Sequence, residues 1–259
     1  MKEIKFISHL SRNIYLYFGV YFALLFIANH QIPSDHFLLG LTAFFIGYAP
    51  VYFLNDFIDQ HEDTIKHKSN LYTYVNNATI YWTITILTVV IGGAISYAIS
   101  PIAFLILILL YICNTLYSVK PVRLRDRTYL NLIIIFFIYA IKFYYMTVLL
   151  NFPMNELPLS FVIMSGSLGA LSTAFYKRHI KRQKLAEYIL TFLFTVSWMI
   201  TIILYDQTFF LFFPLIFILF YFHIKYKNNQ IPIGKYQTIY FIYSVTVWFI
   251  QIILIPGIT

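Results

Sequence analysis

The chain has 259 residues, of which 60% are hydrophobic and only 11% are charged, and its net charge is +8. Soluble globular proteins carry roughly 25% charged residues, so this composition, with a mean hydropathy of +0.75, excludes a water-soluble enzyme and a disordered chain. The single cysteine, Cys113, excludes a disulfide framework and leaves a structural zinc site without a ligand set.

Apolar segments follow one another along the whole chain, each long enough to cross the ~30 Å hydrocarbon layer of a membrane as a helix. They run over residues 13–29, 36–55, 76–99, 101–118, 129–149, 157–176, 186–205, 207–226 and 236–256. We therefore predict an all-α protein, a polytopic membrane bundle of nine transmembrane helices that forms a single domain over residues 1–259.

The connections between these segments differ sharply in charge. All but one of the 18 Lys and Arg residues lie in the N-terminal segment or in every second connection, and the opposite connections contain none. Because short loops rich in Lys and Arg stay in the cytoplasm, we expect a multi-pass protein of the cell membrane with a cytoplasmic N-terminus. The same rule accounts for the positive charge without a nucleic-acid partner, for which the sequence has no recognised motif.

An acidic motif, NDFIDQHED, follows the second segment at residues 55–63. Asp56, Asp59 and Asp63 stand at positions i, i+3 and i+7, so on a helix they share one face. Three like charges at the edge of a membrane repel one another, and a hard divalent cation relieves this repulsion. We predict that the three carboxylates hold Mg²⁺. The alternative is a helix end whose carboxylates pair with nearby lysines or with arginines of a neighbouring loop.

This motif resembles the first aspartate-rich motif of the UbiA superfamily of intramembrane prenyltransferases. The stretch Leu116-Tyr117-Ser118, followed by Pro121, Arg123 and Leu124, is similar to the Tyr-Ser…Pro-x-Arg-Leu signature after that family's fourth span. Nine spans with a cytoplasmic active site are also the family arrangement. The resemblance implies that the aspartates hold Mg²⁺ against the diphosphate of a donor, that the diphosphate leaves, and that an acceptor attacks the resulting cation-like carbon.

The sequence departs from the family pattern in two places. The second aspartate motif, expected between the sixth and seventh spans, is missing, because no carboxylate occurs between Gly166 and Glu187. The Arg-Pro pair expected after the first motif is replaced by Lys68-Ser69-Asn70-Leu71.

One subgroup of the superfamily is similar in these features. In phosphoribosyltransferases that act on polyprenyl phosphate, a Lys-Arg pair follows a Gly-Ser-Leu helix and a Lys-Asn pair opens the first span. Lys177-Arg178 after Gly166-Ser167-Leu168 resembles the first feature, and Arg12-Asn13 resembles the second. The donor is therefore either a prenyl diphosphate or phosphoribosyl diphosphate, with an isoprenoid lipid as a substrate in both cases.

The predicted site opens on the cytoplasmic side of the membrane. We assign catalytic roles to Asp56, Asp59 and Asp63, the Mg²⁺ ligands, and to Lys177 and Arg178, which neutralise charge on the leaving diphosphate. The remaining candidates bind substrate; they are Asn55, Tyr117, Lys120, Arg123, Lys142, Lys181 and Arg12.

Among these candidates, Lys142 is unusual because it lies inside the fifth apolar segment. A lysine is costly to bury there, so it contacts a phosphate, an acceptor or an internal partner.

Two rival classes remain. A transporter for a phosphorylated solute commonly shows internal repeats and broken helices at the membrane centre, and the sequence displays neither. A catalytically inactive scaffold with the same fold would explain the missing second aspartate motif, but the three aspartates of the first motif are retained.

The distribution of charge predicts the topology. A cysteine placed at Lys181 or Lys227 should react with a membrane-impermeant thiol reagent only in permeabilised cells, whereas one placed at Asn155 should react in intact cells. Labelling at position 181 from outside intact cells would contradict a site that faces the cytoplasm.

Overall fold

The structure, a computed structural model, describes residues 17, 24, 34–65, 70–75, 77–153, 155, 157, 159–176 and 184–205. All regular structure among these residues is helical, which agrees with the predicted all-α class. The elements are α3 (Ser34–Ile65), α4 (Leu71–Val75), α5 (Ala78–Ile99), α6 (Pro101–Ser118), the short 3₁₀ helix η2 (Leu124–Asp126), α7 (Thr128–Leu149), α8 (Leu159–Tyr176) and α9 (Lys184–Tyr205).

The helices α5 to α9 begin and end within two residues of the predicted segments. The helix α3 differs, because it continues to Ile65 and carries the whole acidic motif on its last turns. The predicted first, eighth and ninth segments lie outside the described residues, apart from the buried helical residues Tyr17 and Leu24. The number of nine transmembrane helices therefore stays a prediction.

Within the described part, length and composition allow four helices to cross a membrane. They cover His36–Ile65, Ala78–Ile99, Pro101–Ser118 and Tyr129–Leu149. Two shorter apolar helical stretches, Leu159–Leu171 and Tyr188–Ser197, follow.

Capping side chains mark where α5 and α6 begin. The side chain of Asn77 accepts a hydrogen bond from the backbone N–H of Ile80 at 3.1 Å, which satisfies a free donor in the first turn of α5. Ser100 ends α5 and caps α6, with Pro101 at the first helical position, where its missing N–H costs nothing. This tight corner explains why the predicted and observed bounds of α6 coincide.

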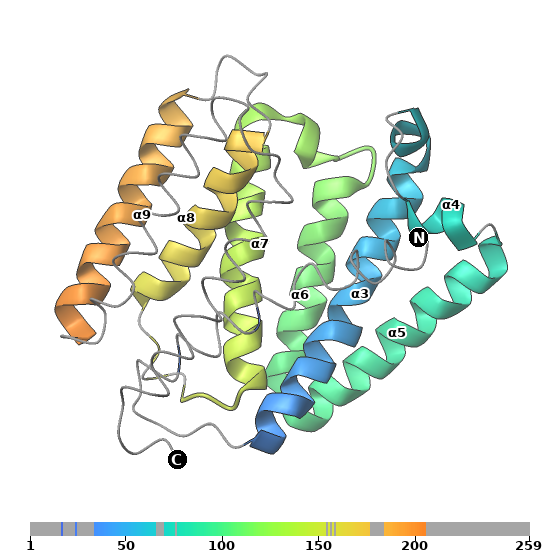
Figure 1. Cartoon of the computed structure of the whole chain (residues 1–259), viewed down its shortest axis with the longest axis horizontal. Coiled ribbons are helices and arrows are strands. Elements are labelled where there is room, and N and C mark those ends of the chain that lie inside the picture. Colours follow the sequence, from blue (N-terminus) through green and yellow to red (C-terminus); the bar gives the residue numbers. More distant parts are fainter. Residues whose placement is uncertain are drawn as a thin grey trace, which may run out of the picture. The chain divides into compact units, whose positions relative to one another are not determined.

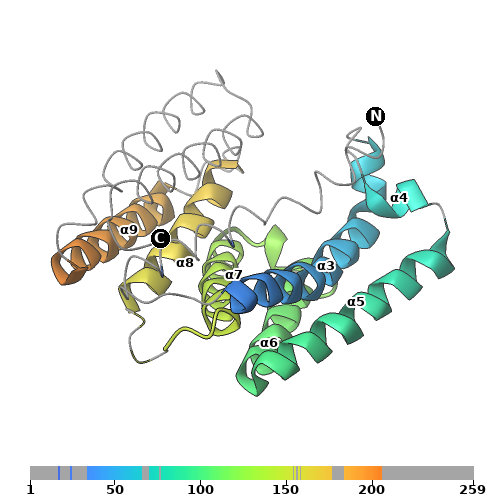
Figure 2. The same cartoon turned by 60° about the horizontal axis from the view of Figure 1, so that its bottom comes forward.

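By its contacts, the chain divides into two compact units, Met1–Trp198 and Met199–Thr259, and the packing that follows lies in the first. Consecutive long helices from α3 to α8 alternate in direction (Figure 1). The helix α3 packs on α5, α6 and α7, and α7 packs on α6 and α8, an arrangement that is also visible in Figure 2. The C-terminal end of α3, the helix α4 and the α6–α7 connection therefore lie at the same end of the bundle.

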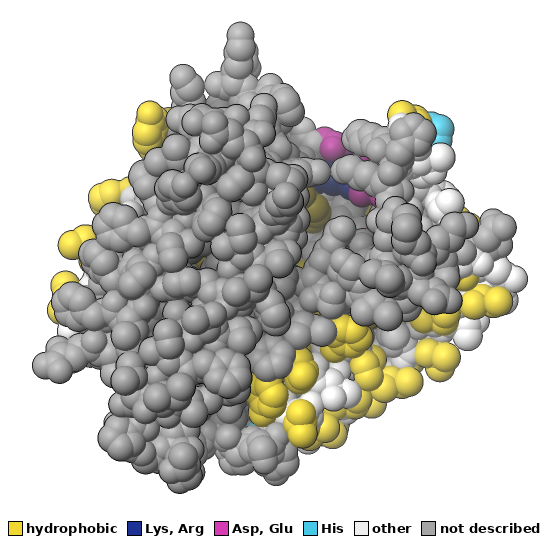
Figure 3. Space-filling model, viewed as in Figure 1, with side chains coloured by type: hydrophobic (Ala, Val, Ile, Leu, Met, Phe, Trp, Pro, Cys, Tyr) yellow, Lys and Arg dark blue, Asp and Glu magenta, His cyan; other side chains and the backbone are white. Residues whose placement is uncertain are grey.

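The surface differs between this end and the sides of the helices. Large apolar side chains of α5, among them Ile80, Leu87 and Val90, are exposed, as expected for a helix that faces lipid. On the face that Figure 3 shows, the acidic and basic side chains that are visible lie at the end that carries α4.

The backbones of α3 and α5 touch where two glycines face each other. A Cβ atom on Gly92 would lie 2.4 Å from the Cα of Gly47, whereas a Cβ atom on Gly93 would meet only the ring of Phe104 at 3.3 Å. Small residues allow membrane helices to approach this closely. The contact holds α5 against α3, the helix that carries the acidic motif.

We predict that Gly92→Ala destabilises the protein because the new methyl group overlaps backbone atoms that cannot move aside. Overpacking of this kind costs about 1–3 kcal/mol. Gly93→Ala is the matched control, since the Phe104 ring can shift and both variants gain the same helix propensity. Thermal unfolding in detergent, followed by circular dichroism, should show a lower midpoint for Gly92→Ala alone. Equal midpoints for the two variants would contradict the close contact.

Candidate functional site

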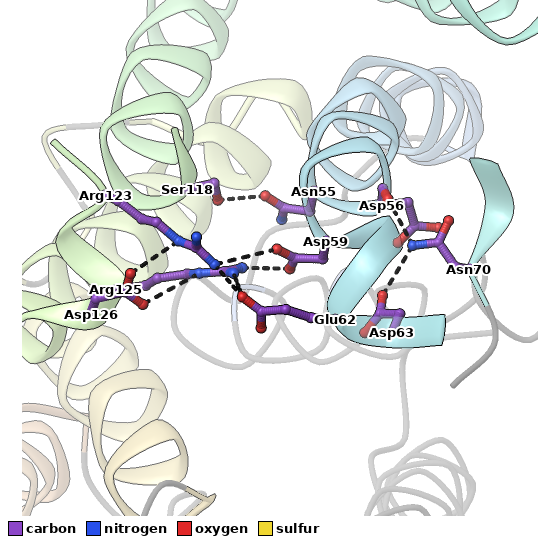
Figure 4. A network of polar contacts seen from close by, with 10 residues as sticks. All are labelled: Asn55, Asp56, Asp59, Glu62, Asp63, Asn70, Ser118, Arg123, Arg125 and Asp126. Carbon is purple, nitrogen blue, oxygen red and sulfur yellow. Dashed lines mark hydrogen bonds and ion pairs between the residues drawn. The ribbon is translucent and has the colours of Figure 1, made fainter. Parts of the chain in front are cut away.

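The last turns of α3 carry their polar side chains in two groups that face different neighbours. Helical spacing places Asp59 and Glu62 toward the α6–α7 connection, and it places Asp56 and Asp63 toward the segment that begins α4. Figure 4 shows the two groups and their partners: Asn55, Asp59 and Glu62 with Ser118, Arg123, Arg125 and Asp126, and Asp56 and Asp63 with Asn70. The three aspartates that the sequence placed on one stripe are thus divided between two sets of partners.

On the first side, two arginines surround Asp59, and together with Glu62 and Asp126 they form what we call the arginine cluster. Arg125 Nη1 forms an ion pair with Asp59 Oδ2, and Arg123 Nη2 lies 3.9 Å from Asp59 Oδ1. Glu62 Oε1 accepts from both guanidinium groups, at 2.7 Å from Arg123 and 3.4 Å from Arg125. Both arginine side chains are largely buried, and the Asp59 side chain is 21% exposed, whereas that of Glu62 is 47% exposed, so the pairs with Asp59 are the more sheltered ones.

Asp126 completes the arginine cluster from the far side. Its carboxylate forms ion pairs with Arg123 Nε at 3.1 Å and with Arg125 Nε at 3.8 Å, and it is the most exposed of the three acids. The hydrogen bond that Arg123 donates to Glu62 raises the pKa of the Arg123 guanidinium above its ordinary value. Arg123 is therefore a permanent cation at this end of α3.

The backbone of the α6–α7 connection fixes the positions of the two arginines. Arg123 has φ 32°, in the left-handed region that residues with a Cβ atom rarely adopt. Its N–H donates to the carbonyl of Val119 at 2.8 Å, which closes the turn after α6. Below this turn, Ser118 Oγ donates to Asn55 Oδ1 and ties the end of α6 to α3. Backbone strain of this kind is concentrated at functional sites.

On the second side, Asn70 joins α3 to α4 and forms what we call the Asn70 cluster with Asp56 and Asp63. Asn70 Nδ2 donates to the backbone carbonyl of Asp56 at 2.7 Å and to Asp63 Oδ2 at 3.0 Å. Asp56 Oδ2 accepts from the N–H of Leu71, also at 2.7 Å. Both Asp56 and Asn70 are buried. The first aspartate of the motif therefore supports the chain at the start of α4.

The residues present suit a hard cation in their chemistry, although their arrangement differs from the predicted one. Asp59 Oδ1 is buried and accepts no hydrogen bond from the described residues, and a carboxylate oxygen in that state is a ready ligand for Mg²⁺. In the same part of the chain, no group of three or more His, Cys, Asp or Glu side chains is placed to hold a metal ion. The pairing of Asp59 with loop arginines is the alternative that the sequence also allowed.

Lys142 lies deep between helices, with only 4% of its surface exposed. Its Nζ atom lies over the ring of Tyr48, 4.0 Å from the centroid, and 5.0 Å from the centroid of Tyr139. Such contacts stabilise a desolvated ammonium group by about 2 kcal/mol. Asn114 accepts a hydrogen bond from Tyr48 at 3.5 Å. Lys142 thus has internal aromatic partners. One of them, Tyr48, stands on α3 about two helical turns before the acidic motif.

Of the other predicted site residues, two lie within the described part of the chain and four lie outside it. Tyr117 packs against the core between α6 and α7, and Lys120 is exposed in the α6–α7 connection. Four lie outside the described residues, and their roles stay predictions: Arg12, Lys177, Arg178 and Lys181.

The sequence interpretation missed several partners of the aspartates. Arg125 was treated only as one of the positive loop charges. In a chain with so few charged residues, every basic residue in a loop on the same side as the acidic motif is a candidate partner for its aspartates. Asn70 carried a weak signal, because asparagine before an apolar residue is typical of a helix N-cap. Glu62 and Ser118 belong to the two motifs but were given no role, and Asp126 had no signal apart from its proximity to the second motif.

Comparison with known proteins identifies the family. The model of the UbiA prenyltransferase family matches residues 16–184. A solved structure of a UbiA homolog from Archaeoglobus fulgidus is similar, with a TM-score of 0.66 and 17% identity over 95% of this chain and 99% of that chain. No curated protein matches.

Two further structures of that homolog are also similar. The form bound to DMAPP and Mg²⁺ has a TM-score of 0.65 and 17% identity over 92% of this chain and 96% of that chain. The form bound to Cd²⁺ has a TM-score of 0.64 and 16% identity over 92% of this chain and 97% of that chain. These likenesses establish the fold, and because the family model matches more than half of the sequence, the chain belongs to the UbiA prenyltransferase family.

Proposed function

We propose that the protein transfers a prenyl group from a prenyl diphosphate to a lipophilic or aromatic acceptor, inside the membrane and with Mg²⁺. The observation that carries this proposal is the meeting of the partly buried Asp59 with two arginines at the end of α3. Family membership supports it, as does the fold likeness to a homolog whose structure was solved with DMAPP and Mg²⁺.

In this reaction the bond between the allylic carbon and the diphosphate oxygen breaks, and the acceptor forms a new bond to that carbon and loses a proton. Negative charge grows on the departing diphosphate, so groups that stabilise it lower the barrier. Mg²⁺, when bound, supplies positive charge next to the phosphates. Asp56, Asp59 and Asp63 are the residues that would hold it, and Asn55 supports them from α3.

The arginine cluster supplies the second source of positive charge. Arg123 and Arg125 are paired with Asp59 and Glu62, and these contacts compensate charges that would be costly to bury alone. A diphosphate offers better bidentate acceptors for a guanidinium group than one shared carboxylate oxygen. When the donor binds, the arginines exchange carboxylates for phosphate oxygens, and the carboxylates become available to the metal.

The aromatic contacts of Lys142 suggest where the organic substrate lies. Tyr48 and Tyr139 present ring faces to a cation deep in the bundle, and such faces also stabilise a carbon that gains positive charge. We therefore assign Lys142 and its two tyrosines to the wall of the chamber that receives the isoprenoid or the acceptor.

The rival donor, phosphoribosyl diphosphate, rests on Gly166-Ser167-Leu168 and the Lys177-Arg178 pair. Packing gives another reason for the glycine, because a Cβ atom on Gly166 would lie 2.9 Å from the carbonyl oxygen of Phe136 on α7. A glycine that close packing requires does not favour a sugar donor. In our proposal Lys177, Arg178, Lys181 and Arg12 instead provide the cytoplasmic side of the diphosphate site that the missing second aspartate motif would have formed with a metal.

We expect Asp59→Asn to lower kcat/KM for a prenyl diphosphate by about a hundredfold or more, since it removes charge that orders both the metal and the arginines. Asp126→Asn is the matched control, because Asp126 contacts the same arginines but is exposed and lies away from α3. Release of diphosphate by purified protein with Mg²⁺ measures both. Full activity of Asp59→Asn, or activity that a chelator leaves unchanged, would contradict the proposal.

We also expect Arg125→Ala to raise the KM for the donor about tenfold or more, because hydrogen bonds to a charged group contribute about 1.5–3 kcal/mol. Arg125→Lys should restore only part of the loss, since an ammonium group cannot make the bidentate contact. Arg127→Ala, which removes the same charge from an exposed position two residues away, is the control. Equal KM values for Arg125→Ala and Arg127→Ala would exclude a direct role for Arg125.

A further inference from the structure

Asn70 uses every polar atom of its side chain to join the acidic motif to α4. Its two Nδ2 hydrogens go to the carbonyl of Asp56 and to Asp63 Oδ2. Its Oδ1 atom accepts from the N–H of Thr73 at 3.3 Å, which caps α4. The side chain is 7% exposed, so none of these bonds is easily replaced by water. This residue stands in the stretch where the chain departs from the Arg-Pro pair that the resemblance leads one to expect.

Two of these bonds go to residues of the acidic motif, Asp56 and Asp63. Asp56 and Asp63 stand two turns apart at the C-terminal end of α3, where the helix dipole disfavours negative charge. Each has one carboxylate oxygen held by an N–H donor, from Leu71 for Asp56 and from Asn70 for Asp63. A metal-binding carboxylate is commonly held in this way, with one oxygen fixed by a neighbour so that the other keeps its direction.

Apolar packing also holds α4 on α3, and this contribution is distinct from the effect of Asn70 on the aspartates. Leu71 is buried in a cluster with Phe53 and Tyr81, and the Tyr72 ring meets the Phe57 ring edge-on at 5.2 Å. These apolar contacts hold α4 on α3 alongside the bonds of the amide. The hydrogen bond to Asp63 Oδ2 is separate from that packing, and it fixes the carboxylate of Asp63.

We infer that Asn70 is a positioning residue for the cation site: its side-chain amide holds Asp63, and with it the end of α3, in the orientation that binds the metal. This inference rests on the proposed function, because it concerns the same carboxylates. It also explains how the chain manages without the Arg-Pro pair after the acidic motif, since an amide that donates twice and accepts once joins α3 to α4 directly.

The experiment measures binding of Mn²⁺, which prefers the same oxygen ligands as Mg²⁺, by electron paramagnetic resonance on the purified full-length protein without substrate. Asn70→Ala should weaken Mn²⁺ binding by about 10–100-fold, the usual effect of removing a group that orients a ligand. Asn70→Ser keeps an oxygen that can cap α4 but loses the reach of the amide donor, so it should weaken binding similarly while the protein stays folded.

Asn77→Ala is the matched control, because Asn77 caps α5 in the same manner and forms no hydrogen bond to a carboxylate of the described residues. It should bind Mn²⁺ like the wild type. Wild-type affinity in Asn70→Ala and Asn70→Ser, or an equal loss in Asn77→Ala, would overturn the positioning role alone. A folded wild-type protein that binds no Mn²⁺ would overturn the proposed function and this inference together, so the two failures are distinguishable.

Discussion

Carboxylates on the last turns of α3 stand at the negative end of a long helix and beside an apolar bundle, and both conditions disfavour ionised acids. Each aspartate of the motif therefore needs a partner that is close and held in place. Asp59 receives Arg125 and Arg123, and Asp56 receives the N–H of Leu71. The strained turn at Arg123 and the position of α4 bring these partners to α3.

This electrostatic balance connects the structure to the proposed function. An isolated set of aspartates would need a metal to be stable, whereas the arginine cluster neutralises Asp59 in the absence of one. In the proposed reaction these arginines would contact the diphosphate of the donor. Binding of donor and metal would then be an exchange of partners among charges already assembled, which limits the number of unpaired buried ions.

The sequence predicted the bounds of α5 to α9 well, and the ends of α5 and α6 carry local signals. Ser100 and Pro101 mark the corner between α5 and α6, and hydropathy defines the cores of the spans. Hydropathy could not show that α3 continues to Ile65, because it reports where the chain leaves an apolar layer and not where a helix ends.

The contents of the site were only partly predictable, for a different reason. The spacing of Asp56, Asp59 and Asp63 indicated a shared stripe, but its partners come from the segment before α4 and from the α6–α7 connection. The way in which the two loop arginines, Arg123 and Arg125, both reach Asp59 depends on the backbone at Arg123, a tertiary feature without a local signature. Asn70 was visible in the sequence as a weak helix N-cap signal and as a departure from a family pattern, but neither signal showed its contacts with Asp56 and Asp63.

The most direct test of the account is a comparison of donors with the wild-type protein in a lipid environment. Diphosphate release is measured with prenyl diphosphates and with phosphoribosyl diphosphate plus polyprenyl phosphate, each with Mg²⁺ and with a chelator. If the carboxylates and arginines bind a metal diphosphate, as proposed, diphosphate is released from a prenyl diphosphate and the release stops when Mg²⁺ is removed. Release only from the sugar donor, or release from a prenyl donor that persists without Mg²⁺, would contradict that account.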